Sequence, residues 1–405
     1  MSSEIFVARQ PIFDRRQQVF AYELLFRSGL DNVFTHPDQD QASFLMLHTS
    51  LLGFGLDTLI GDKLGFINAS REVLLQEFYM VLPRDRAIIE LVKNVEPDAE
   101  VIAACEALKR AGYRLALDDF IRRPEIEPLA DLADFIKVDF VATSAADRRA
   151  LVKAYAGRGI QFVAEKVESR KDLAEAEQDG YTHFQGYFFC EPEVMTGSDV
   201  PAFKRNCIRF MQELNHPELD FDRLEAVIKY EMALVVKLLR YLNSAGFGWR
   251  HEVTSIRQAL RVLGERSTRK WCSLMAVTLL GEDKPPELVV TALIRAQFCE
   301  QVGRVVGMSN RDVDLFLVGM LSMLDSMLGR PLEMALSDMP VAQEIKDTLL
   351  GSNTSLSRIY LLVRAYERAD WEHLSPLAES AGISVGRLPD LYRQSVQWVD
   401  RIFKG

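Results

Sequence analysis

The chain has 405 residues, of which 48% are hydrophobic and 26% are charged, a composition typical of two or three folded domains and not of a disordered chain. The net charge of −10 argues against a surface that attracts nucleic acid over its whole extent. The five cysteines form no C-x-x-C pair, which argues against a disulfide framework or a zinc site. No apolar run has the length of a membrane helix or the form of a signal peptide. We therefore expect a cytoplasmic protein with no membrane and no nucleic-acid partner.

Residues 1–200 are predicted to form a β/α domain on a largely parallel sheet, because short β-rich runs alternate with helical patterns. The predicted strands are Ile5–Ala8, Val19–Leu25, Leu64–Ile67, Ala87–Leu91, Arg114–Leu117, Phe135–Val138, Gln161–Ala164 and Thr182–Phe184. Helical patterns at Glu100–Ala111 and Ala146–Arg158 lie between them. Glycines such as Gly180 follow these patterns, where a helix is expected to end.

Residues 201–405 are predicted to form an all-α domain, because the β signal disappears beyond Pro201. An amphipathic stripe runs from Leu224 to Leu242 and stops at Asn243–Gly246. Further helices are expected at Ser255–Leu263, Lys270–Leu279, Leu288–Val306, Asp312–Leu328, Val341–Leu350, Ser355–Arg368 and Leu388–Phe403. The turn-rich composition of Glu193–Val200 places the domain boundary there.

Acidic and polar residues recur at or just after the predicted strands of the first domain. They are Glu23, Asn68, Glu90, Asp118, Asp119, Lys137, Asp139, Glu165, Glu168 and Gln185. In a parallel β/α barrel the strand ends meet at one face, so distant residues can line a single pocket. Oxygen ligands without a His or Cys cluster favour Mg²⁺ or Mn²⁺ over zinc. Taken singly, Asp118 and Asp119 could equally form a cap or a turn, and Asn68 could be a helix N-cap.

Six motifs in this half appear in the order and spacing of a known family. They are Tyr22–Glu–Leu–Leu–Phe–Arg27, Ile67–Asn–Ala–Ser70, Leu117–Asp–Asp–Phe120, Ile136–Lys–Val–Asp139, Ala164–Glu–Lys–Val–Glu168 and Gln185–Gly–Tyr–Phe188. From about residue 4 to 195 the chain therefore resembles the EAL domain. The resemblance implies a modified, TIM-like β/α barrel that hydrolyses cyclic di-GMP to linear pGpG.

The same resemblance implies a role for each residue at the strand ends. The implied ligands of a first Mg²⁺ or Mn²⁺ ion are Glu23, Asn68, Glu90 and Asp118, and Asp119 helps to hold a second. The implied catalytic residues are Glu165 as general base, Lys137, which orients the attacking water, and Asp139. The implied substrate contacts are Arg27, Gln185 and Glu168. Two metal ions can clamp the attacking and leaving oxygens of a phosphodiester.

Three departures from the family pattern fall around this predicted site. Lys93 stands three positions after Glu90, where active members carry a second glutamate. Ile121–Glu125 replaces a Gly-Thr-Gly-type loop, and its residues cannot adopt the same glycine-dependent backbone. Lys166 replaces the usual glycine after the general base. A lysine that points into the site would pair with a carboxylate or compete with the cation. These departures predict a degenerate EAL domain.

The second half resembles the HDOD domain, an all-helical output module, from about residue 205 to 400. The resemblance lies in Leu238–Gly248 and Ser255–Gly264, and a generic helical bundle stays open as the alternative. None of the six histidines is followed by Asp, which excludes the metal centre of HD hydrolases. Ala378–Ser384 has the spacing of a helix-turn-helix turn, but we do not expect DNA binding, because Pro389 would break the recognition helix.

The order of the two modules resembles EAL-HDOD signalling proteins. The sequence therefore predicts a signalling protein with a catalytically weak or inactive EAL domain. It would act by binding cyclic di-GMP, or by contacting a protein partner through the HDOD domain. The first alternative is an active, metal-dependent phosphodiesterase that produces pGpG, and the second is a scaffold that binds neither nucleotide nor metal. The sequence leaves the oligomeric state open.

Overall fold

The computed structural model describes residues 5–28, 55–76, 79, 82–190, 207, 211, 214, 219–230, 255–337, 339 and 341–404. The chain forms two compact units. The barrel unit comprises Met1–Glu191 and Tyr366–Ser375, and the helical unit comprises Pro192–Ala365 and Pro376–Gly405. The boundary near residue 200 stays a prediction, because it falls between the described residues 190 and 207.

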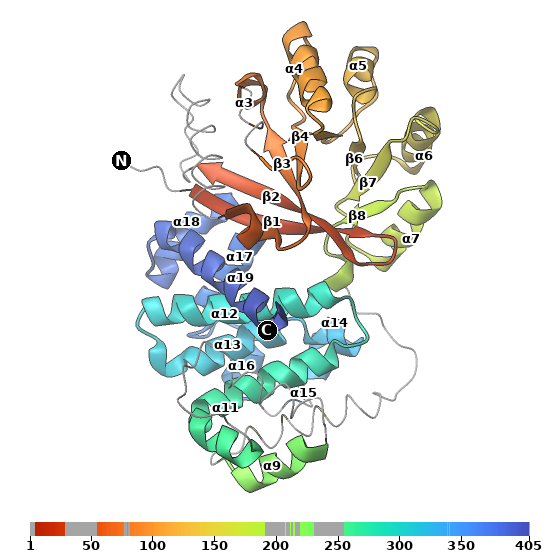
Figure 1. The fold of residues 1–405 in the computed structure, drawn as a ribbon. Coiled ribbons are helices and arrows are strands. Elements are labelled where there is room, and N and C mark those ends of the chain that lie inside the picture. Colours follow the sequence, from red (N-terminus) through yellow and green to blue (C-terminus); the bar gives the residue numbers. More distant parts are fainter. Residues whose placement is uncertain are drawn as a thin grey trace. The chain divides into compact units, whose positions relative to one another are not determined.

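Eight strands close into a barrel in chain order (Figure 1). They are β1 (Ile5–Asp14), β2 (Val19–Ser28), β3 (Leu64–Ala69), β4 (Ala87–Leu91), β5 (Arg114–Leu117), β6 (Phe135–Asp139), β7 (Gln161–Glu165) and β8 (His183–Gln185). Strands β2 to β8 pair in parallel, whereas β1 runs antiparallel to both β2 and β8. The prediction of a TIM-like β/α barrel is thus confirmed, with one reversed strand.

One cluster of buried apolar residues joins seven of the strands. Its members are Ile12, Ala21, Phe66, Ile88, Ala116, Phe135 and Val163, each at most 1% exposed. Phe66 and Phe135 meet edge to face with ring centroids 5.3 Å apart. Side chains of a strand alternate between its two faces, so residues two positions from this cluster share its face of the sheet. The cluster therefore fixes which residues of each strand lie beside it.

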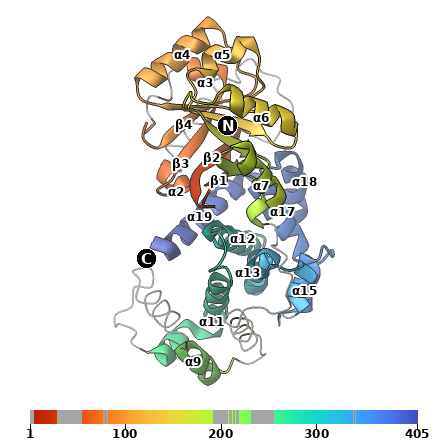
Figure 2. The same ribbon diagram turned by 90° about the vertical axis from the view of Figure 1, so that its right-hand side faces the viewer.

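Helices follow most of the parallel strands, and Figure 2 shows α4, α5 and α6 outside the strands. They are α2 (Leu56–Ile60), α3 (Arg71–Leu75), α4 (Ala99–Arg110), α5 (Glu127–Ala130), α6 (Ala145–Ala154) and α7 (Arg170–Asp179). Side-chain caps start several of these helices, since Ser70, Asp98 and Ser144 each accept a hydrogen bond from a backbone N–H three residues ahead. Ser169 and Asp172 form a capping box at α7, which ends at the left-handed Gly180.

A segment from late in the sequence also belongs to the barrel unit. Tyr366–Ser375 comprises the end of α17 (Ser357–Glu367) and the start of α18 (Trp371–Ala381). The hydroxyl of Tyr366 donates a 3.0 Å hydrogen bond to the carbonyl oxygen of Val7 on β1. The ring of Trp371 lies 5.8 Å from that of Phe6 between centroids. This segment covers the start of β1.

Every regular element described beyond residue 207 is helical, as predicted. Besides α17 and α18 these are α9 (Phe221–Tyr230), α11 (Ile256–Leu280), α12 (Pro286–Val305), α13 (Asp312–Leu321), α14 (Leu324–Leu328), α15 (Leu332–Ser337), α16 (Gln343–Leu349) and α19 (Leu388–Lys404), with short 3₁₀ turns between some of them. Helices α12 and α13 pack closely side by side (Figures 1 and 2). None of the described helices is both long and apolar enough to cross a membrane.

Three helix predictions differ from the structure. The helices predicted at Ser255–Leu263 and Lys270–Leu279 both fall on α11, which is kinked at Gly264, where φ is 71°. The pattern predicted over Asp312–Leu328 forms two helices, α13 and α14, which are separated at Ser322 and Met323. The Ser322 hydroxyl donates a 2.6 Å hydrogen bond to the carbonyl oxygen of Gly319 at this break. Pro389 does not break a helix, because it lies in the first turn of α19, where a proline loses no helical hydrogen bond. The predicted stop at Asn243–Gly246 lies outside the described residues.

Candidate active site

A layer of polar residues lies two positions beyond the apolar cluster on most strands. Its members, one for each of the strands β2 to β8 and within the strand or directly after it, are Glu23, Asn68, Glu90, Asp118, Lys137, Glu165 and Gln185. Glu23 follows Ala21, and Glu90 follows Ile88, with the same spacing. The period of two residues turns both layers to the same side of the sheet. This repeated spacing brings together residues that are up to 162 positions apart in the sequence.

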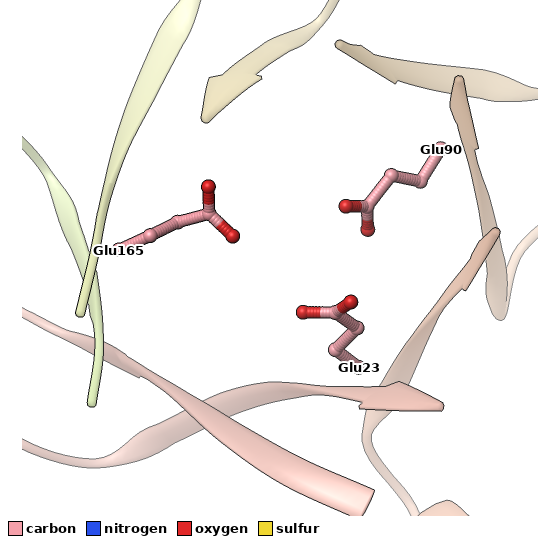
Figure 3. A group of neighbouring side chains, drawn as sticks. All are labelled: Glu23, Glu90 and Glu165. Atoms are coloured by element: carbon pink, nitrogen blue, oxygen red, sulfur yellow. The ribbon is translucent and has the colours of Figure 1, made fainter. Parts of the chain in front are cut away.

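Lys137 lies at the centre of this layer and is fully buried. Its ammonium nitrogen is 2.8 Å from Glu23 Oε2, 2.6 Å from Glu90 Oε1 and 2.9 Å from Glu165 Oε1. Asp118 Oδ1 is farther away, at 3.9 Å. Figure 3 shows the three glutamate carboxylates pointing toward one another from different strands. One ammonium group therefore neutralises several carboxylates at close range.

Burial, mutual repulsion and contacts with Lys137 shift the pKa values of the carboxyl groups in this layer. Burial first, and then the charge of Glu23, raise the pKa of Glu90 well above its usual value. Burial also raises the pKa of Glu165 to about 7, although Lys137 opposes this shift. Burial acts in the same direction on Glu23, but Lys137 and hydrogen bonds from Gln185 and Asn68 outweigh it and lower the pKa of that residue. The layer thus carries more negative potential than Lys137 alone can balance.

Two groups of carboxylate oxygens in the described residues are close enough to share a cation, with ligand atoms within 4.8 Å of one another. We call Glu23, Glu90 and Glu165 the inner oxygen group, and Asp118, Asp119 and Glu165 the outer oxygen group. Glu165 belongs to both. The donor set consists of oxygens alone, which suits Mg²⁺ or Mn²⁺.

The inner oxygen group and the neighbouring Asn68 each have an acceptor atom that no protein donor satisfies. Glu90 Oε2 and Asn68 Oδ1 are buried and have no hydrogen-bond partner, although Asn68 Nδ2 donates to Glu23 Oε1 at 3.3 Å. Buried acceptors are normally satisfied, so these two atoms are available to a ligand. The inner oxygen group together with Asn68 therefore fits a divalent cation.

The outer oxygen group is flanked by two lysines. Lys93 Nζ lies 3.2 Å from Asp119 Oδ2, and Lys166 Nζ lies 2.6 Å from Asp139 Oδ2. Asp139 pairs with Glu165 in the register of β6 and β7. The side chains of Lys93 and Lys166, whose direction the sequence alone does not give, thus each reach a carboxylate at the carboxyl end of the barrel.

The remaining predicted site residues lie around these groups. Gln185 Nε2 donates to Glu23 Oε2 at 2.6 Å, and Gln185 Oε1 is buried without a partner. Arg27 lies four positions after Glu23 on the same face of β2, whereas Glu168 is exposed in the turn after β7. The roles assigned to all of these residues stay predictions.

Sequence reasoning missed Gln10, whose side-chain oxygen accepts a 3.0 Å hydrogen bond from Gln185 Nε2. Gln10 lies two positions before the core residue Ile12, because β1 runs in the opposite direction to the other strands. The alternation around Ile12 would have revealed it, once β1 was known to be antiparallel.

Comparison with protein families finds a match in each half of the chain. Residues 62–192 match the EAL domain, and residues 200–330 match the HDOD domain. A Bacillus subtilis protein named uncharacterized protein YuxH is 31% identical over 97% of this chain and 98% of its own length. A Vibrio cholerae protein named cyclic di-GMP phosphodiesterase CdgJ is 31% identical over 91% of this chain and 86% of its own length.

Solved structures of EAL proteins match about half of the chain. The EAL enzyme Bd1971, bound to cAMP and cyclic di-GMP, is 16% identical with a TM-score of 0.40, over 46% of this chain and 61% of its own. Klebsiella pneumoniae BlrP1, in a complex with manganese and cyclic di-GMP, is 23% identical with a TM-score of 0.39, over 46% of this chain and 56% of its own. The chain thus spans less than two thirds of either of these proteins.

Proposed function

The chain belongs to the family of proteins that join an EAL domain to an HDOD domain, and we propose that its barrel binds cyclic di-GMP together with one or more divalent cations and hydrolyses it slowly or not at all. The observation that carries this proposal is the inner oxygen group, whose buried Glu90 Oε2 has no partner. The EAL enzymes Bd1971 and BlrP1 have been solved with cyclic di-GMP.

The residues of the site suit a phosphodiester ligand. A divalent cation at the inner oxygen group would supply positive charge to a phosphate oxygen. Gln185, whose buried side-chain oxygen is unsatisfied, offers a polar contact beside Glu23. Glu165, with its pKa raised by burial to about 7, can hold or release a proton near neutral pH.

Weak turnover is proposed because of Lys93, which lies three positions after Glu90. Lys93 is paired with Asp119, the carboxylate that the family resemblance assigns to a second cation. A positive side chain at this position lowers the affinity of Asp119 for a metal ion. Lys166 similarly engages Asp139 beside Glu165. The protein would then act as a receptor for cyclic di-GMP.

The alternative is an active phosphodiesterase that releases pGpG. It is favoured by the 31% identity to CdgJ, which is named a cyclic di-GMP phosphodiesterase. It is also favoured by the position of Glu165, which lies beside Lys137 in the polar layer.

Calorimetric titration separates these functions. Cyclic di-GMP is titrated into the full chain with Ca²⁺, and products are then analysed by chromatography with Mg²⁺ or Mn²⁺. Binding without pGpG supports the receptor, and pGpG supports the phosphodiesterase. Glu90→Gln should weaken cation-dependent binding at least tenfold, whereas Glu100→Gln, at an exposed residue of α4, should leave it unchanged. If the wild-type chain binds no cyclic di-GMP, both functions are wrong and the barrel is a scaffold.

For the helical unit we propose a protein partner. Residues 200–330 match the HDOD domain, and the resemblance to that output module supports a binding role. Co-purification of proteins with the full chain, in the presence and absence of cyclic di-GMP, tests this. The Glu90→Gln variant controls for the contribution of the nucleotide.

A further inference from the structure

The two oxygen groups differ in how their negative charge is balanced. In the inner oxygen group, Lys137 contacts one oxygen of Glu90 and leaves the other without a partner. In the outer oxygen group, Asp119 contacts Lys93, and the neighbouring Asp139 contacts Lys166. The inner group therefore keeps a buried, unsatisfied acceptor although the ammonium group of Lys137 contacts all three of its carboxylates, whereas the outer group has two further ammonium groups, on its member Asp119 and on the neighbouring Asp139.

The two lysines reach different carboxylates beside the outer oxygen group. Lys93 Nζ is 3.2 Å from Asp119 Oδ2, within the group, and Lys166 Nζ is 2.6 Å from Oδ2 of Asp139, which pairs with Glu165 in the register of β6 and β7. Lys93 reaches Asp119 from the turn after β4, whereas Lys166 approaches from the end of β7.

Two of the residues in these ion pairs, Asp119 and Lys166, have an unusual backbone conformation. Asp119 has φ of 43° and Lys166 has φ of 56°, both in the left-handed region that favours glycine. Such a conformation is unfavourable for a residue that carries a Cβ. A glycine at position 166 would avoid this strain but would lack the ammonium group. Lys166 thus combines a backbone conformation that favours glycine with an ammonium group that contacts Asp139.

We propose that Lys93 and Lys166 take the place of a second divalent cation at the outer oxygen group, so that each barrel binds a single ion at the inner group. This inference rests on the proposed function and specifies its cation requirement. One ion at the inner group can neutralise a phosphodiester. Without a second ion, the site lacks the clamp that stabilises both the attacking and the leaving oxygens. The two lysines thus act as positioning residues that favour binding over hydrolysis.

Mn²⁺ alone, titrated into the full chain without nucleotide, tests this proposal. The protein is first treated with a chelator, and free Mn²⁺ is followed by its electron paramagnetic resonance signal. The wild-type chain should bind one Mn²⁺. The variant Lys93→Glu with Lys166→Gly should bind two, because it adds a carboxylate and removes both ammonium groups. Two adjacent ions should also give a spin-coupled spectrum, which a structural effect of the substitutions would not produce.

A matched variant controls for the change in net charge. Lys153→Glu with Lys63→Gln alters the charge by the same amount, but Lys63 precedes β3 and Lys153 lies in the last turn of α6, toward the opposite end of the strands. It should bind one ion, like the wild type. If the wild type binds two ions, or if the Lys93 and Lys166 variant still binds one, the inference is wrong. If the wild type binds none, the cation site of the proposed function is also wrong. Failure of cyclic di-GMP binding leaves the Mn²⁺ count unaffected, so the two failures are distinguishable.

Discussion

Replacing Lys137 by methionine should destabilise the barrel far more than removing an exposed lysine. Methionine has a similar length, so the change mainly removes the charge. Lys137 is fully buried and contacts three carboxylates within 3 Å. Loss of one partner from a buried ion pair costs about 3–5 kcal/mol, because the remaining charge is left uncompensated. For a unit of about 200 residues, this corresponds to a fall in Tm of roughly 6–20 °C.

The matched control is Lys171→Met in the same unit. Lys171 is 84% exposed and pairs with Glu175 at 3.8 Å, one helical turn away. An exposed pair of this kind contributes only about 0.3–0.5 kcal/mol. Circular dichroism melts of both variants with a chelator give the comparison, and excess Mg²⁺ should restore part of the Tm lost by Lys137→Met. If the two variants melt at the same temperature, Lys137 does not balance the charge of the polar layer.

Two further predictions concern β8. Burial lowers the pKa of His183 to about 4 from 6.5, so the unfolded chain binds more protons between these values, and stability should fall by up to about 3 kcal/mol as the pH drops from 6.5 to 4. The free energy of unfolding of His183→Phe, measured with urea, should not show this fall between pH 6.5 and 4. If it falls as steeply with pH as that of the wild type, His183 is not the source of the fall. At Gly186, with φ of 148°, a Cβ would overlap the carbonyl oxygen of Val167, so Gly186→Ala should cost about 1–3 kcal/mol and weaken cyclic di-GMP binding measured by calorimetry. Gly157→Ala, where a Cβ has open space, should leave that binding unchanged; equal effects of the two substitutions would contradict the clash.

The strands were predictable because each repeats one physical pattern. Ala87–Leu91 and Arg114–Leu117 have the predicted bounds, since a run of buried apolar residues is bounded by turns. The polar layer was predictable for the same reason, because it follows the apolar layer at a spacing of two residues. Motif order supplied the functional interpretation of that layer.

The ion pairs were not predictable from sequence. Lys93 and Lys166 were recognisable as departures from the family pattern, but the sequence does not reveal that Asp119 and Lys166 have positive φ values, which help to set the direction of their side chains. The contact of Tyr366 with Val7 joins residues 359 positions apart, and no local periodicity predicts such a contact. Position along a strand is a local property, whereas side-chain partners depend on the closed barrel.

The ten residues Tyr366–Ser375 give the barrel a discontinuous sequence. A fragment that ends near residue 200 would lack Tyr366, which is fully buried, and would leave the carbonyl oxygen of Val7 without its donor. It would also expose Phe6, which contacts the ring of Trp371. Cyclic di-GMP affinities measured on such a fragment would describe an incomplete barrel. Exchange of whole domains with a related protein would likewise have to carry Tyr366–Ser375 along with the EAL domain.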